Sequence, residues 1–108
     1  MYQGTTPALT FVIEDNDMSG MTPFVSFKRG QDILTNTTPD VTVVYDSDNQ
    51  KTVIVCQLTQ EETLNIRQGS AIAQIRFIDS NGNAYATTKS EVEVKDVIYK
   101  EIISYGGA

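Results

Sequence analysis

Short runs in which apolar and polar residues alternate make up most of this sequence. In residues 8–14, Leu9, Phe11 and Ile13 fall on the same side of an extended chain. A period of two residues is typical of β-strands that bury one face. Similar runs, separated by polar turn-forming segments, follow at residues 22–28, 32–37, 41–45 and 51–58. The last of these is apolar on both faces, which favours a central strand or one covered by a partner.

The longest alternating pattern covers residues 71–94, where two runs flank the polar segment 79–83. Asn81-Gly82 within that segment predicts a β-hairpin turn, because both residue types tolerate a positive φ. We expect a long, continuous second strand in this hairpin, with Tyr85 on its outward face. The expected core residues of the hairpin are Ile75, Phe77, Val92 and Val94.

The alternation stops at residues 59–65, which read TQEETLN. Thr59 followed three residues later by Glu62 matches a capping box, in which each residue's side chain bonds the other's backbone N–H. We therefore expect one short helix near residues 60–65, with Leu64 as its core anchor. Gly69 is expected to stop the helix.

These elements predict an all-β, antiparallel immunoglobulin-like β-sandwich of about seven or eight strands with one short helix. The 108 residues are enough for one domain and too few for two, so we expect a single domain over residues 1–108. The sequence has no Trp and only one Cys, so the disulfide–tryptophan core of antibody domains is absent. The immunoglobulin-like label therefore describes architecture alone.

Composition narrows the possible functions. The net charge of −6, with scattered basic residues, argues against nucleic-acid binding. The absence of histidine excludes Ser-His-Asp triads and His-ligated metals. Cys56 lies in an apolar run and is expected to be a buried hydrophobe. An acid-dependent hydrolase needs two carboxylates in one cleft, whereas most acids here fall in turns or on outward positions. We expect no enzyme activity and no cofactor.

One polar cluster has the spacing of a calcium loop. Asp15, Asp17 and Ser19, followed by Gly20, match the opening of such a loop and are the candidate calcium ligands. The position of the bidentate glutamate is occupied by Ser26, however, and no helix is expected on either side. Asp and Ser also populate ordinary turns, because their side chains bond the local backbone. The turn interpretation is favoured.

Residues 97–105 read VIYKEIISY and are rich in apolar and β-branched side chains. Such a segment either completes its own sheet or adds to the edge of a sheet in another chain. Tyrosine is also favoured at interfaces. The interface candidates are Tyr85, Val97, Ile98, Tyr99, Ile102 and Ile103. The N-terminus resembles no signal peptide and no run is long enough to cross a membrane, so we expect neither secretion by a signal peptide nor a membrane partner.

Four stretches together resemble a known group of proteins: MYQGTTPALTFVI, LTQEET, IRQGSAIAQIRFIDSNGNAYAT and VEVKDVIYKEII. They are similar to small tail- and baseplate-associated proteins of phages and prophages of Firmicutes, and to the N-terminal immunoglobulin-like domain of baseplate upper proteins. The resemblance covers nearly the whole chain and carries no catalytic residues. It implies a non-enzymatic structural module that is synthesised in the cytoplasm of a bacterial host and bound to other tail or baseplate proteins.

Self-association and a place in the virion are left open by this resemblance. A second hypothesis, drawn from the tyrosines and the Asp-containing loops, is a β-sandwich that binds carbohydrate or a cell surface. The two hypotheses give Tyr85 different roles. In the first it is part of a protein interface, and in the second it contacts a carbohydrate.

Overall fold

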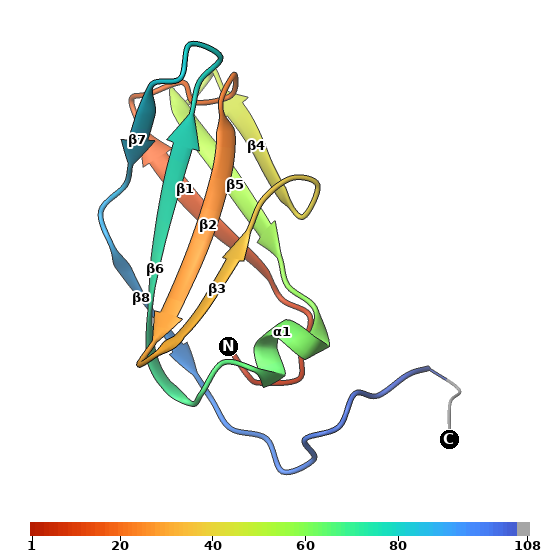
Figure 1. Ribbon diagram of the computed structural model, residues 1–108. Coiled ribbons are helices and arrows are strands. Elements are labelled where there is room, and N and C mark those ends of the chain that lie inside the picture. Colours follow the sequence, from red (N-terminus) through yellow and green to blue (C-terminus); the bar gives the residue numbers. More distant parts are fainter. Residues whose placement is uncertain (106–108) are drawn as a thin grey trace.

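A computed structural model describes residues 1–105 of the chain (Figure 1). The elements in chain order are β1 (Ala8–Glu14), β2 (Thr22–Arg29), β3 (Asp32–Asn36), β4 (Val41–Asp46), β5 (Lys51–Gln57), α1 (Gln60–Leu64), β6 (Gly69–Ile78), β7 (Ala84–Ala86) and β8 (Ser90–Val94). The predicted class, an all-β antiparallel sandwich of about seven or eight strands with one short helix, is confirmed.

The strands form two antiparallel sheets. One has the order β1-β5-β4, and the other has the order β3-β2-β6-β7, with β8 also pairing with β6. The central position of β5 confirms the prediction made from its apolar residues on both faces. Ile54 and Cys56 point to the core and are fully buried, whereas Val53 and Val55 lie on the outer face and are partly buried.

The core lies between the two sheets and contains the inward residues that alternation predicts. Its buried apolar residues are Val25, Phe27, Val41, Ile54, Cys56, Leu58, Ile66, Ala71, Ala73, Ile75, Phe77 and Val94. Val92 packs against this cluster and is partly buried. Burial of each large apolar side chain contributes about 1.5–3 kcal/mol relative to leaving it exposed.

The second strand of the long hairpin is not continuous, contrary to the prediction. It is divided into β7 and β8, and the register changes between them. Tyr85 pairs with Phe77 and Ser90 pairs with Ala73, so five steps along β7–β8 face four steps along β6. One extra residue of this kind is a β-bulge. As a result Tyr85 lies on the core side of the sheet with Phe77, and its predicted outward position is wrong.

Thr87 completes the hydrogen bonding at this bulge. Its backbone N–H donates to the carbonyl oxygen of Ile75 at 2.9 Å. Its side-chain Oγ1 accepts from the backbone N–H of Ile75 at 3.1 Å. The hydroxyl therefore takes the place of a missing ladder carbonyl, which satisfies the backbone donor of a buried residue.

The hairpin turn lies where the sequence places it, but its backbone geometry differs from the expected one. Only Gly82 has a positive φ, at 84°, and Asn81 does not. The Gly82 N–H donates to the carbonyl of Asp79 at 3.2 Å. The Asp79 carboxylate in turn accepts from the backbone N–H groups of Asn81 and Asn83, both at 2.9 Å. The turn thus needs a single left-handed residue and an aspartate that bonds its backbone.

The capping box of α1 is confirmed. Thr59 Oγ1 accepts from Glu62 N–H at 3.2 Å, and Thr59 N–H donates to Glu62 Oε1 at 2.9 Å. The predicted end of the helix is wrong, because the C-cap is Asn65 and Gly69 instead begins β6. Leu64 is only partly buried, and Ile66 is the deeper anchor. None of the helices among residues 1–105 combines the length and apolar character needed to cross a membrane.

Candidate functional site

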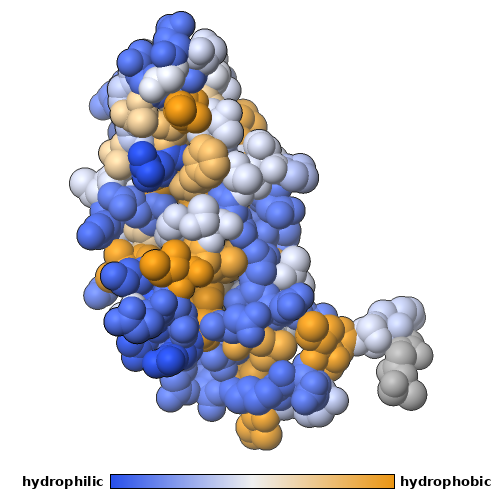
Figure 2. Space-filling view, in the orientation of Figure 1, coloured by the Kyte–Doolittle hydropathy of each residue, from blue (hydrophilic) through white to orange (hydrophobic). Residues whose placement is uncertain are grey.

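The chain leaves the sandwich after β8. Residues 97–105, here called the C-terminal segment, form no strand and run away from the sheets on the side of α1 (Figure 1). Five large side chains on it are exposed: Ile98 at 101%, Tyr99, Ile102, Ile103 and Tyr105. Val97 is half-buried. Figure 2 shows the resulting hydrophobic side chains along this segment at lower right. The segment therefore presents most of the predicted interface residues to solvent.

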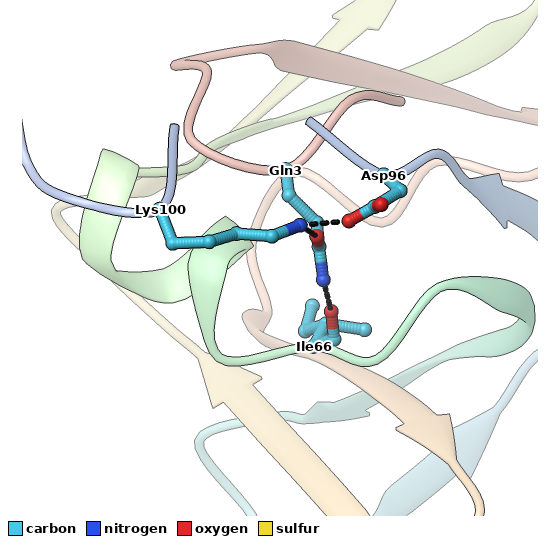
Figure 3. Close-up of polar contacts among 4 residues, drawn as sticks. All are labelled: Gln3, Ile66, Asp96 and Lys100. Carbon is cyan, nitrogen blue, oxygen red and sulfur yellow. Dashed lines mark hydrogen bonds and ion pairs between the residues drawn. The ribbon is translucent and has the colours of Figure 1, made fainter. Parts of the chain in front are cut away.

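Polar contacts fix the path of the C-terminal segment. The buried side chain of Gln3 donates from Nε2 to the Ile66 carbonyl at 2.6 Å and accepts at Oε1 from Lys100 Nζ at 2.9 Å. Lys100 also forms an ion pair with Asp96 (Figure 3). Further along, the Gln60 amide bonds both backbone groups of Ile103, at 2.7 and 2.9 Å. These bonds hold the backbone while the apolar side chains face outward.

A groove opens between the two sheets, where β1 of one sheet faces β6, β7 and β8 of the other. We call it the inter-sheet groove; its volume is about 980 Å³. Its apolar lining includes the core-facing side of β1 and the loop after it: Leu9, Phe11, Ile13, Met18 and Met21. Tyr85 also lines the groove and is 45% exposed. The groove exists because β1 and β7 both end their sheets.

The charges that line the inter-sheet groove have one sign. Asp17 and Glu91 are among its lining residues, and no lysine or arginine is. Hydrogen bonds from the Ser19 hydroxyl, and next from its backbone N–H, lower the pKa of Asp17. Asp17 therefore carries its full negative charge at neutral pH.

The calcium candidates lie in a turn between β1 and β2. One carboxylate oxygen of Asp17 accepts from Ser19 N–H at 2.9 Å and from Ser19 Oγ at 2.6 Å. Asp15 has a φ of 61° and bonds the Gln50 carbonyl through its backbone N–H. Among residues 1–105, no three His, Cys, Asp or Glu side chains are grouped so that they could hold a metal ion. This geometry is that of a hydrogen-bonded turn.

The outer face of the three-stranded sheet carries an apolar feature that sequence reasoning did not single out. Val53 pairs with Val12 on one side and with Val44 on the other, which places three valines in one row across the sheet. Val12 and Val44 are exposed. The apolar residues on both faces of β5 were the available signal for this row.

The lone thiol is a core group, as predicted. Cys56 is fully buried, and its nearest polar partner is the side-chain amide of Asn36, which donates to Sγ at 3.7 Å. Burial raises the pKa of the Cys56 thiol. A neutral, enclosed thiol is a poor nucleophile.

Comparison with known proteins adds no family to this picture: no family model matches the sequence, and no curated protein matches it either. The resemblance to phage tail and baseplate proteins therefore stays an expectation. The structure offers two apolar features that differ in kind: the exposed C-terminal segment and the open inter-sheet groove.

Proposed function

We propose that this chain is a non-enzymatic structural module of a phage or prophage tail or baseplate, and that it acts through protein–protein contacts. The observation that carries the proposal is the C-terminal segment, with its exposed Ile98, Tyr99, Ile102, Ile103 and Tyr105. Large apolar side chains gathered on one segment mark an interaction site. The phage setting comes from the sequence resemblance.

A protein partner fits these features better than a carbohydrate does. The groove next to Tyr85 has polar lining residues, among them Asp17, Thr87 and Glu91, but its floor is formed by the apolar side chains of Leu9, Phe11 and Ile13. An apolar floor suits the side chains of a protein segment better than the hydroxyl groups of a sugar. The C-terminal segment has the residue types that are enriched in the centres of protein interfaces. In an extended conformation, this segment would also pair with a strand edge of a partner.

Co-purification with the products of neighbouring tail genes tests this proposal. The full chain is tagged and co-expressed with those genes, alongside an Ile102→Asp/Ile103→Asp variant. Ile33→Asp is the matched control, because Ile33 is 67% exposed but lies on β3. We expect the unmodified chain and the control to capture a tail protein, and the segment variant to lose it.

Two results would contradict the proposal. One is the absence of any captured tail protein with the unmodified chain. The other is binding to a glycan array that is lost in Tyr85→Ala, which would favour the carbohydrate-binding hypothesis.

A further inference from the structure

We infer that the C-terminal segment of one copy docks as an added strand in the inter-sheet groove of a second copy. This inference rests on the proposed function, because both assign protein contacts to the C-terminal segment. It adds that the partner is a second copy of the same chain. The groove supplies free strand edges and an apolar floor. The segment, which forms no strand in the free chain, supplies exposed apolar side chains.

The groove has the features that accept a strand. On one side, β1 is the last strand of its sheet, and within residues 1–105 no further strand pairs with its outer edge. On the other side, β7 ends the larger sheet. Unpaired backbone groups at such edges bond an incoming strand. The partly buried Leu9, Phe11 and Ile13 form the floor against which its side chains would pack.

The segment has the length and the pattern of such a strand. At about 3.3 Å per residue, an extended nine-residue segment spans roughly 30 Å, whereas the seven residues of β1 span roughly 23 Å. Ile98, Lys100 and Ile102 would share one face of the strand, and Tyr99, Glu101 and Ile103 the other. The segment is therefore long enough to cover β1.

Charge favours placing the first of these faces in the groove. Lys100 lies between Ile98 and Ile102, and the residues that line the groove include Asp17 and Glu91 but no lysine or arginine. Docking would transfer Lys100 from its ion pair with Asp96 and its hydrogen bond to Gln3 into this acidic surrounding. The chain as a whole carries a net charge of −6, so two copies repel one another at long range. A lysine that enters an acidic groove offsets part of that repulsion.

The C-terminal segment cannot turn directly back into the inter-sheet groove of the same chain. The N-terminal residues occupy the edge of β8 there: the Met1 amino group bonds the Glu93 carbonyl, and Lys95 N–H bonds the Met1 carbonyl at 2.7 Å. Beyond them, Gln60 holds Ile103 beside α1. A direct return along β8 is thus blocked. Docking in the groove of another copy exchanges the bonds of the segment to Gln60 and Gln3 for backbone bonds to β1 of that copy.

Sedimentation equilibrium of the full chain, from micromolar to millimolar concentration, is the first test. We expect the unmodified chain to associate, and Ile98→Asp/Ile102→Asp to remain monomeric with an unchanged melting temperature, because both side chains are exposed. Ile33→Asp should associate like the unmodified chain. A monomer at millimolar concentration, or equal loss of association in the control, would overturn the inference.

A disulfide between two differently tagged chains is the second test. Thr10→Cys on the outward side of β1 is mixed with Glu101→Cys on the outward face of the docked strand. We expect a mixed disulfide in this pair and none when Ile33→Cys replaces Thr10→Cys, since Cys56 is buried in every chain. Equal cross-linking of both pairs would reject the docking geometry.

The two proposals fail separately. A monomeric chain that still captures tail proteins would reject strand docking and keep the proposed function. An associating chain that captures none would support strand docking and count against the phage role.

Discussion

Tyr85 lies directly opposite Phe77 in the ladder between β6 and β7. Directly paired residues share a face of the sheet, so the tyrosine side chain points to the same side as the buried Phe77. The bulge that follows β7 then returns Val92, seven residues later, to that same side opposite Ala71. The bulge therefore places a partly exposed aromatic residue in the inter-sheet groove instead of on the outer surface.

Replacing Thr87 by valine should destabilise the fold. The Thr87 hydroxyl is the side-chain acceptor for the backbone N–H of Ile75, which is buried. A buried donor left without a partner costs about 1–3 kcal/mol. We expect the free energy of unfolding from urea denaturation to fall by that amount in Thr87→Val and to change little in Thr87→Ser. Equal stability of the valine and serine variants would contradict this role of the hydroxyl.

Replacing Gly82 by valine should weaken the hairpin turn. Gly82 has a φ of 84°, and a Cβ there would meet no atom within 4 Å, so backbone strain alone sets the cost. Left-handed backbone costs an L-residue about 1–2 kcal/mol, and a β-branched one more than alanine. We expect the order of stability Gly82, then Gly82→Ala, then Gly82→Val in thermal unfolding. A valine variant as stable as the unmodified chain would show that the turn does not need this geometry.

Stability should fall in acid because of three turn aspartates. The pKa of Asp79 is lowered by backbone N–H groups, chiefly that of Asn83, and those of Asp17 and Asp46 are lowered mainly by the side chains of Ser19 and Asn49. A carboxyl whose pKa is lower in the folded state stabilises the fold above its unfolded-state pKa. That contribution is lost as the pH falls below the ordinary value of 3.8 through the folded-state pKa.

Urea denaturation as a function of pH measures this effect. We expect Asp79→Asn to be less stable than the unmodified chain at pH 7 and the two to converge as the pH falls below about 4. A difference that stays constant across the acid range would assign the loss to something other than the charge of Asp79.

Millimolar calcium should leave the melting temperature unchanged. The Asp17 carboxylate oxygen already accepts two hydrogen bonds from Ser19. Calcium prefers six to eight oxygen ligands, and this turn groups too few carboxylates to supply them. Thermal unfolding with added calcium checks the expectation. A saturable rise in melting temperature that disappears in Asp17→Asn would establish a calcium site.

Local patterns predicted most of the fold. The alternation of Leu9, Phe11 and Ile13 defined β1, and the Thr59–Glu62 pair defined the start of α1, because each depends only on nearby residues. The bulge at Thr87 escaped prediction because residues 84–94 alternate without interruption, while the register depends on pairing with β6. Gly69 was wrongly assigned to the end of the helix. A glycine with a positive φ can end a helix or begin a strand, and here it begins β6.

Of the two candidate features, only the C-terminal segment could be predicted from the sequence. The apolar residues Val97 to Ile103 indicated an interface in the sequence itself. The inter-sheet groove could not be predicted in this way. It forms where β1 and β7 end two different sheets, and about 70 residues of chain separate these strands. Sequence periodicity describes the faces of single strands and contains no information on which edges stay open.

Amide hydrogen exchange of the full chain, compared between its free and its assembled form, tests the central claim most directly. Assembly here means association with itself or with a captured tail protein. We expect slower exchange in residues 97–105 on assembly, because their backbone gains hydrogen bonds, with slower exchange in β1 as well if the partner is a second copy. Unchanged exchange throughout residues 97–105 in an assembled complex would contradict the assignment of this segment as the interaction element.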